Sequence, residues 1–283
     1  MKRRSSKKIR VRKAVIPIAG MGTRFLPLSK IIPKEFFPLG TKPAIQYIVE
    51  EAVNAGIEEI IFVVSPKKKA IFKNYILKYF KEEKGLLKIL EKRKKGKAIA
   101  TLKNIPRIKY RYTIQKKPLG DGDAILRAEK LVKKEPFLVL FGDDISWAKE
   151  GMSSQMAKMF QKVKSPLLCL YKMPKNKLPA YGVPEVKKVK GRLYRILDLI
   201  EKPKRNPPSS FAIVGKYILT PQIFSYLKKI RPHNGEIILA NALRQQIKEG
   251  KQVFGLWIKG KWLECGDRKK WLESLIFIAK DKK

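Results

Sequence analysis

Cysteine and histidine are the residue types that this sequence has least of. Its two cysteines, Cys169 and Cys265, lie far apart and form no Cys-x-x-Cys pair, which excludes a disulfide framework and a structural zinc site. The one histidine, His233, is followed by Asn234 and Gly235, a setting typical of a solvated loop. A single histidine argues against a His-dependent catalytic triad and against a multi-histidine metal site.

Long apolar runs are also missing. A membrane-spanning helix needs about 18 or more apolar residues, whereas the longest runs here, such as residues 137–141, have the length of a strand. Residues 1–13 carry eight Lys or Arg but lack the apolar core of a signal peptide. We therefore expect a cytoplasmic protein without membrane insertion, in which a basic tail (residues 1–12) precedes one domain (residues 13–283).

Acidic residues are scarce: 24 Asp and Glu stand against 65 Lys and Arg, giving a net charge of +41. Such a charge favours binding to nucleic-acid phosphates through counterion release. The excess is nevertheless spread over the whole chain, and runs such as residues 67–69 and 92–97 fall at predicted helix starts and loops. This distribution is typical of a solvated lysine-rich surface, so nucleic acid is not the expected partner.

Apolar periodicity predicts alternating strands and helices. Residues 13–19 form a short apolar run, residues 43–55 place Ile45, Ile48 and Val49 on one helical face, and residues 59–65 are again apolar throughout. Further helices are expected at 68–81, 86–102, 122–132, 152–163, 221–229, 236–249 and from 268, and further strands at 109–115, 137–142, 166–171, 182–189, 193–201, 210–219 and 252–258. This order predicts an α/β Rossmann-like protein with a mixed, mostly parallel central sheet and a small antiparallel extension.

A glycine-rich loop, AGMGTRFLP at residues 19–27, follows the first predicted strand. Gly20 and Gly22 let backbone amides approach an anion closely, and Arg24 can neutralise its charge. The loop matches neither a P-loop nor a complete dinucleotide fingerprint. Lys34 follows in IIPKEFFPL, a segment that two prolines make rigid rather than helical.

The segments GMGTRFLP and PKEFFPL resemble those of sugar nucleotidyltransferases, and most closely the bacterial UTP–glucose-1-phosphate uridylyltransferases. The resemblance recurs in order at QKKPLGDGDAIL, FLVLFGDDI, AYGVPEV, LIEKPKRNPPSSFAIVGKYILTPQIF, GEIILANAL and GKWLECGDRKKWL. It extends from residue 13 to the C-terminal helix. It implies a nucleotidyltransferase fold, a reaction of UTP with glucose 1-phosphate that yields UDP-glucose and pyrophosphate, Mg²⁺ as cofactor, and a homo-oligomer.

The resemblance implies that Asp143 holds the metal. This residue follows the strand at 137–142, where open α/β sheets bind ligands, and carboxylate oxygens suit Mg²⁺. An aspartate after a strand can also serve a turn or a helix cap. The second metal carboxylate of related enzymes falls at Glu264, where they carry aspartate, and Asp267 could compensate for the altered reach.

Other roles also follow from the resemblance. Ala19, Gly20 and Gly22 hold the nucleotide, while Gln115 and Gly120 meet the uracil edge, which suits an amide that carries both a donor and an acceptor. Arg24, Lys34 and Lys202 are the catalytic cations: the first two stabilise the triphosphate and its leaving pyrophosphate, and Lys202 pairs with the sugar phosphate. The resemblance assigns the sugar itself to Gly182, Glu201 and Gly215.

Three positions depart from the pattern of these enzymes. Asp123 stands where they carry histidine, Asn241 where aspartate is common, and Glu264 has one extra methylene. We interpret Asp123 as a cap of the helix that begins nearby. Two alternatives stay open: a sister enzyme that uses dTTP or another sugar 1-phosphate, and a catalytically silent relative whose basic surface binds nucleic acid or an acidic membrane.

Overall fold

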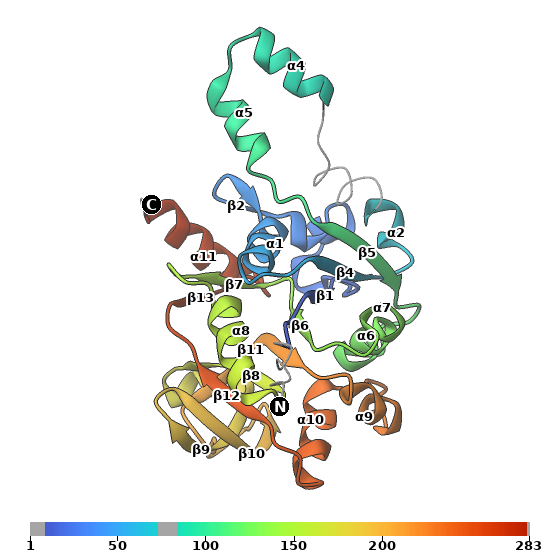
Figure 1. The fold of residues 1–283 in the computed structure, drawn as a ribbon, viewed down its shortest axis with the longest axis vertical. Helices are drawn as coiled ribbons and strands as arrows, with labels where there is room; N and C mark the ends of the chain where they lie inside the picture. The colour runs from blue at the N-terminus through green and yellow to red at the C-terminus, as the bar shows by residue number, and fades with distance from the viewer. Residues whose placement is uncertain (1–8, 73–83, 282–283) are drawn as a thin grey trace, which may run out of the picture.

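A nine-stranded mixed sheet organises the protein, with strand order β5-β4-β1-β6-β11-β8-β12-β10-β9 (Figure 1). The structure, a computed structural model, describes residues 9–72 and 84–281. The strands of this sheet are β1 (Lys13–Pro17), β4 (Glu59–Val64), β5 (Lys109–Ile114), β6 (Phe137–Leu140), β8 (Leu167–Lys172), β9 (Gly182–Lys190), β10 (Leu193–Glu201), β11 (Phe211–Leu219) and β12 (Phe254–Trp257).

Parallel and antiparallel parts of this sheet meet at β11. Strands β5, β4, β1 and β6 are parallel neighbours, whereas β11 pairs antiparallel with both β6 and β8. Beyond β8, strand β12 is parallel to it, and β10 and β9 form an antiparallel hairpin. The predicted mixed sheet with an antiparallel extension is confirmed, and the extension is continuous with the main sheet.

Helices cover both faces of the sheet because alternate strand residues point in opposite directions. In β1, Ala14 and Ile16 belong to one apolar cluster and Val15 to the other. The first cluster receives apolar residues of α1 (Ala44–Asn54) and α8 (Met152–Val163). The second receives those of α6 (Asp121–Arg127), α7 (Glu129–Val132), α9 (Ile223–Lys229) and α10 (Leu239–Lys248).

Short elements at the strand ends, which the apolar pattern did not predict, complete the fold. Strand β7 (Asp144–Trp147) pairs antiparallel with β13 (Lys261–Glu264), which places Glu264 opposite Asp144. The last helix, α11 (Arg268–Lys280), follows β13. The remaining short elements are β2 (Pro38–Leu39), β3 (Lys42–Pro43), η1 (Thr23–Phe25), η2 (Leu28–Lys30), η3 (Lys34–Phe36) and η5 (Lys175–Ala180).

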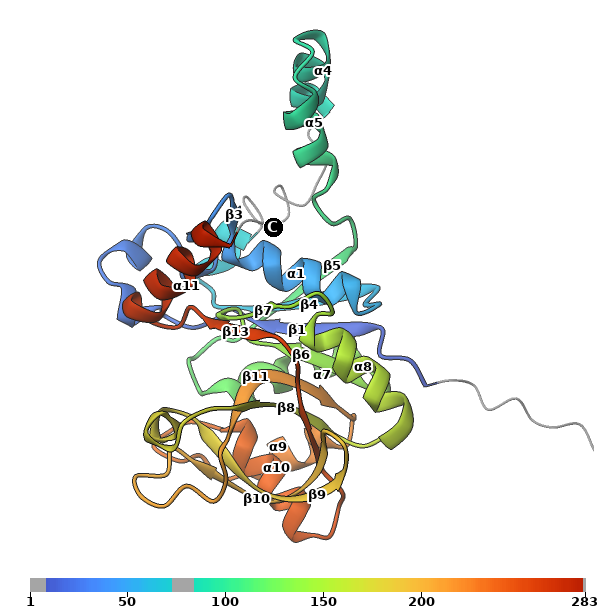
Figure 2. The same ribbon diagram turned by 90° about the vertical axis from the view of Figure 1, so that its left-hand side faces the viewer.

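One helix predicted at 86–102 is wrong. The chain instead forms α4 (Lys84–Lys92) and α5 (Gly96–Lys103), a hairpin that projects from the body (Figure 2). The break has a local cause, since Lys94 adopts a φ of 52°, which a continuing helix does not allow. The helix predicted at 68–81 begins as α2 (Lys68–Ile71), and its continuation falls outside the described residues.

Residues 1–8 of the predicted tail also lie outside the described part of the chain. In residues 9–72 and 84–281, no helix combines the length and apolar character that crossing a membrane requires.

The start of α6 is joined to the start of α10. One carboxylate oxygen of Asp121, Oδ1, accepts hydrogen bonds from the amides of Gly122 (2.8 Å) and Leu239 (3.0 Å). The preceding Gly120 has a φ of 93°, and a Cβ there would lie 2.5 Å from the Ile237 carbonyl oxygen, so this position requires glycine. The predicted helix cap at Asp123 is wrong, because its two oxygens accept from the side chains of Gln115 and Arg127 and no side-chain hydrogen bond caps α6.

Burial raises the pKa of Asp121 to about 6, against an ordinary value of 3.8. Between these values the folded protein keeps a proton that the unfolded chain has released, so this group lowers stability as the pH rises from about 4 to about 6. Asp121→Asn keeps an acceptor oxygen and does not titrate. The difference in unfolding free energy between the variant and wild type should therefore shift by about 2 kcal/mol in favour of the variant as the pH rises over this range. Urea unfolding at several pH values measures it. A difference that does not change with pH would contradict the prediction.

Candidate active site

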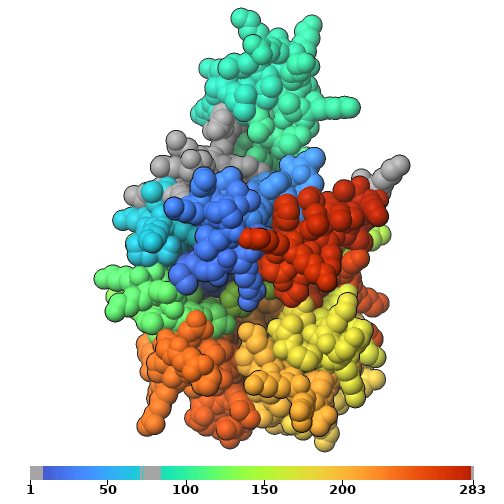
Figure 3. Space-filling view, turned by 180° about the vertical axis from the view of Figure 1, so that it is seen from behind, coloured from blue at the N-terminus to red at the C-terminus, as the bar shows by residue number. Residues whose placement is uncertain are grey.

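A cavity of about 440 Å³ opens at the carboxyl ends of the parallel strands β1, β5 and β6. Its walls bring together many of the residues that the sequence motifs single out: Ala19, Gly20, Gly22, Arg24, Lys34, Gln115, Gly120 and Asp143. They come from segments far apart in the chain, yet the strand ends that carry them meet at one edge. On the face shown in Figure 3, the N-terminal segment and α11 lie side by side, and Arg268 donates a hydrogen bond to the Leu26 carbonyl oxygen.

An ion pair between Lys34 and Asp143 spans the cavity wall, with the Lys34 ammonium 2.5 Å from Asp143 Oδ2. Burial by itself would raise the pKa of Asp143, but the charge and hydrogen bond of Lys34, helped by Arg24, bring that pKa below its ordinary value. For Lys34, burial would lower the pKa, and the Asp143 carboxylate raises it overall. Both groups are therefore charged at neutral pH.

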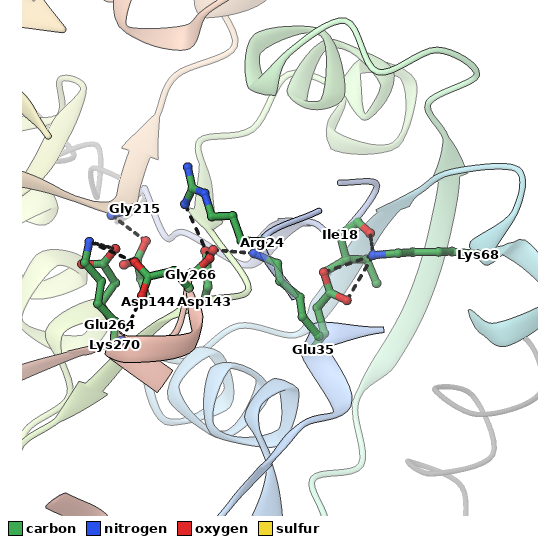
Figure 4. Close-up of polar contacts among 12 residues, drawn as sticks. Ile18, Arg24, Glu35, Lys68, Asp143, Asp144, Gly215, Glu264, Gly266 and Lys270 are labelled. Carbon is green, nitrogen blue, oxygen red and sulfur yellow. Dashed lines mark hydrogen bonds and ion pairs between the residues drawn. The ribbon is translucent and has the colours of Figure 1, made fainter. Parts of the chain in front are cut away.

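Asp144 contacts Gly215 and has a different role from Asp143 (Figure 4). Its Oδ1 accepts a hydrogen bond from the Trp262 indole (2.7 Å) and its Oδ2 one from the Gly215 amide (3.2 Å). Burial and the neighbouring Asp143 charge raise its pKa to about 7. A Cβ at Gly215 would lie 2.1 Å from Asp144 Oδ2, so the close approach at this glycine is to the protein's own carboxyl group. Contact of Gly215 with a sugar stays a prediction.

A buried lysine that sequence reasoning missed holds the Asp143–Asp144 turn. Lys216, fully buried in β11, donates to the Asp144 carbonyl oxygen (2.6 Å) and to Glu51 Oε2 (2.8 Å). The other oxygen of Glu51 accepts from the amide and hydroxyl of Ser153 (2.9 and 2.7 Å). The turn is thereby tied to α1 and to the start of α8. The only feature of the sequence that could have indicated this role of Lys216 is its position as a lysine within an otherwise apolar strand.

A second missed pair anchors the other side of the cavity. The Lys68 ammonium donates to the Ile18 carbonyl oxygen (2.9 Å) and lies 3.1 Å from Glu35 Oε2, with Glu35 only 2 % exposed (Figure 4). This contact connects the end of β1, the segment that carries Lys34 and the start of α2. The glycine-rich loop and Lys34 therefore share one rigid support.

Glu264 lies in β13 beside this cavity. Its Oε1 accepts from the Lys270 ammonium (2.6 Å) and its Oε2 from the Tyr181 hydroxyl (2.5 Å). Asp267, considered as a compensating ligand, instead caps α11 by accepting from the Lys270 amide (3.0 Å). Neither Tyr181 nor Lys270 was predicted as a site residue, although they lie in the segments AYGVPEV and GKWLECGDRKKWL that carry the resemblance.

Asp143 and Glu264 border a common space beside Gly266. A Cβ on Gly266 would lie 3.2 Å from Asp143 Oδ2, 3.5 Å from Glu264 Oε1 and 3.6 Å from Arg24 Nη1, so the two carboxylates share this space with a guanidinium. Within residues 9–72 and 84–281, no group of three or more His, Cys, Asp or Glu side chains gathers in a metal-binding arrangement. An ion here would therefore complete its coordination with substrate phosphates and water, as Mg²⁺ commonly does.

The residues predicted to bind the sugar form a neighbouring group. Gly182 pairs with Glu201 across β9 and β10, and a Cβ on Gly182 would lie 3.1 Å from Glu201 Oε2. Lys202 is exposed, with its ammonium 3.8 Å from Glu201 Oε1, and its amide donates to the Tyr181 carbonyl oxygen (3.1 Å). Because the Tyr181 hydroxyl binds Glu264, this residue connects the predicted sugar group to the predicted metal group.

Comparison with known proteins agrees with this geometry. Residues 13–281 match the family described as Nucleotidyl transferase. The chain belongs to this family. A UTP–glucose-1-phosphate uridylyltransferase of Bacillus subtilis (strain 168) is 39 % identical over 280 residues, covering 96 % of this chain and 93 % of the relative. The resemblance inferred from the motifs is thus confirmed.

Solved structures of the same family are also similar to this one. A UDP-glucose pyrophosphorylase complexed with UDP-glucose superposes with a TM-score of 0.85 at 34 % identity, covering 96 % of this chain and 100 % of that chain. A UTP-bound UGPase from Acinetobacter baumannii gives a TM-score of 0.83 at 30 % identity, covering 94 % of this chain and 93 % of that chain. The predicted nucleotidyltransferase fold is therefore confirmed over nearly the whole chain.

Removing the Lys216 ammonium should destabilise the protein, because Glu51 would remain buried and charged without its partner. We expect Lys216→Met to lose about 3 to 5 kcal/mol of unfolding free energy, measured by urea denaturation. Adding Glu51→Gln removes the charge and keeps an acceptor for Ser153, so the double variant should be more stable than Lys216→Met. A Lys216→Met protein as stable as wild type would show that the buried pair does not hold this turn.

Proposed function

We propose that this member of the nucleotidyl transferase family is a UTP–glucose-1-phosphate uridylyltransferase that forms UDP-glucose and pyrophosphate. The observation that carries the proposal is one cavity lined by a glycine-rich loop, Arg24, Lys34 and Asp143, with Lys34 and Asp143 paired. Cations and carboxylates in one cavity suit a reaction between two polyanions with a divalent ion present. The names of the similar proteins support UTP and glucose 1-phosphate as substrates.

The reaction needs positioning and charge neutralisation rather than a base. A phosphate oxygen of glucose 1-phosphate attacks the α-phosphorus of UTP in line with the leaving group, the bond from the α-phosphorus to the bridging oxygen breaks, and pyrophosphate departs. The attacking phosphate is already an anion at neutral pH, so no proton has to be removed. Consistent with this, the one histidine, His233, is exposed in a loop where its backbone pairs with Glu236.

The cationic side chains stabilise the charge that develops during transfer. In this proposal the amides of Gly20 and Gly22 hold phosphate oxygens, and Arg24 and Lys34 neutralise the triphosphate and the departing pyrophosphate. Lys202 steers the sugar phosphate toward the α-phosphorus. A preorganised donor of this kind contributes roughly 3 kcal/mol to the transition state.

Mg²⁺ is the proposed cofactor, held by Asp143 and Glu264. When bound, it would neutralise phosphate charge on the reacting groups. The two residues border a common space at Gly266, which supports this assignment. Glu264 would then exchange at least one of its present contacts, to Lys270 or Tyr181, for the ion.

The remaining proposals concern the substrates and the assembly. Gln115 and Gly120 are proposed to meet the base, and Gly182, Glu201 and Gly215 the sugar. A cytoplasmic homo-oligomer stays a prediction from the sequence, as does the division into a tail (residues 1–12) and one domain (residues 13–283).

A substrate panel tests the proposed reaction. Pyrophosphate release should be fastest with UTP, glucose 1-phosphate and Mg²⁺ together, and a chelator should abolish it. The other nucleoside triphosphates, dTTP and several sugar 1-phosphates serve as comparisons in the same assay. Preference for dTTP or for another sugar would reassign the substrates, and no release with any pair would overturn the enzyme assignment.

Lys202 offers a test at one side chain. We expect Lys202→Met to lower kcat on the order of 100-fold, because the cation facing the sugar phosphate is lost. Thermal unfolding should change little, since the side chain is exposed. Lys204→Met, an exposed lysine of the same loop, is the matched control and should keep wild-type turnover. Equal turnover in both variants would remove Lys202 from the mechanism.

A further inference from the structure

Both hydrogens of the Gln115 side-chain amide are bound within the protein. Its Nε2 donates to the Gly120 carbonyl oxygen (2.9 Å) and to Asp123 Oδ2 (3.0 Å). An amide nitrogen carries only two hydrogens, so this end of the side chain has no donor left for a ligand. Gln115 is 5 % exposed and lines the cavity, and its remaining polar atom is the carbonyl oxygen Oε1.

Asp123 is held so that it cannot turn away from Gln115. Its side chain is 2 % exposed, and its other oxygen, Oδ1, accepts from both Nε and a terminal nitrogen of Arg127. A carboxylate accepts hydrogen bonds and donates none, so it can face only the nitrogen of the Gln115 amide. The Asp123 carboxylate, held by Arg127, and the Gly120 carbonyl oxygen thereby fix together which way the amide is oriented.

We propose that Asp123 is a positioning residue that determines nucleobase specificity, by fixing Gln115 with its carbonyl oxygen available to the ligand and its nitrogen turned away. A carbonyl oxygen accepts a hydrogen bond from the ring N–H that uracil carries between its two carbonyl groups. Cytosine has an unprotonated acceptor at that ring position, so two acceptors would meet. The inference rests on the proposed function, since it assigns the base to the cavity where Gln115 lies.

The closing experiment uses the full chain and three variants. In Asp123→Asn, the Arg127 guanidinium requires an oxygen, so the new amide nitrogen turns toward Gln115 and two donors oppose each other. The orientation of Gln115 is then opposed at residue 123 and supported only by the Gly120 carbonyl oxygen. We expect the ratio of kcat/KM for UTP to that for CTP to fall about tenfold, mainly through a higher KM for UTP. The variant is isosteric, and Arg127 is partly exposed, so the fold is retained.

Arg127→Met and the double variant separate orientation from general damage. With Arg127 removed alone, Asp123 still faces Gln115, so the ratio should stay near that of wild type. In Asp123→Asn combined with Arg127→Met, the asparagine can turn its oxygen to Gln115, and most of the selectivity should return. A merely structural role for Asp123 predicts no such rescue.

The matched control is Asp198→Asn, a carboxyl-to-amide change at another aspartate that binds an arginine, Arg244, and that does not line the cavity. Its UTP-to-CTP ratio should equal that of wild type.

Calorimetry of UTP and CTP binding without glucose 1-phosphate distinguishes a failure of the proposed function from a failure of the inference about Asp123. A wild-type protein that releases no pyrophosphate contradicts the proposed function but still tests the inference through its nucleotide affinities. Wild type that binds UTP no better than CTP overturns the inference. A wild-type ratio in Asp123→Asn, or a double variant without rescue, overturns it as well.

Discussion

The geometry of the candidate active site depends on how the two carboxyl groups that follow β6 are paired. Asp143 and Asp144 are adjacent, and two buried charges of the same sign cannot be sustained without partners. The protein gives Asp143 the Lys34 ammonium, while Asp144 receives two hydrogen bonds and a pKa raised to about 7. Lys216 then fixes the backbone directly after them through its bond to the Asp144 carbonyl oxygen. One carboxylate is left facing the cavity and the other supports the wall.

The mixed sheet explains why two sets of predicted residues become neighbours. The ends of β1, β5 and β6 gather the glycine-rich loop, Gln115 and Asp143 because parallel strands present their carboxyl ends at one edge. Antiparallel strand β11, which carries Gly215, then continues the sheet toward β9 and β10, which carry Gly182 and Glu201 of the predicted sugar residues. Tyr181 joins the two regions, since its backbone binds Lys202 and its hydroxyl binds Glu264. The residues predicted to bind the two substrates thus lie on either side of the point where the strand direction changes.

The two aspartates that begin α6 show how a departure from a family pattern can acquire separate functions. Asp121 binds backbone amides and joins α6 to α10, whereas Asp123 binds side chains on both of its oxygens. Their spacing alone suggests two helix caps, because short acidic side chains favour that position. The preceding turn has a positive φ at Gly120, where a Cβ would lie too close to the Ile237 carbonyl oxygen. Sequence reasoning therefore identified the acidic segment but predicted a cap at Asp123, where the structure has side-chain partners instead.

Apolar periodicity and ordered motifs were sufficient to predict the α/β class, most strand positions, and the residues that line the cavity. These features are local. Burial determines the spacing of apolar residues along each strand, and a backbone that approaches an anion closely requires glycine at that position. The tertiary structure alone decided the partners: Lys216 with Glu51, Lys68 with Glu35, and Tyr181 with Glu264. Each pair joins residues distant in the chain, and a side chain's type does not reveal which distant group will neutralise it. The break between α4 and α5 and the pairing of β7 with β13 likewise arise from backbone turns and long-range contacts that apolar spacing does not encode.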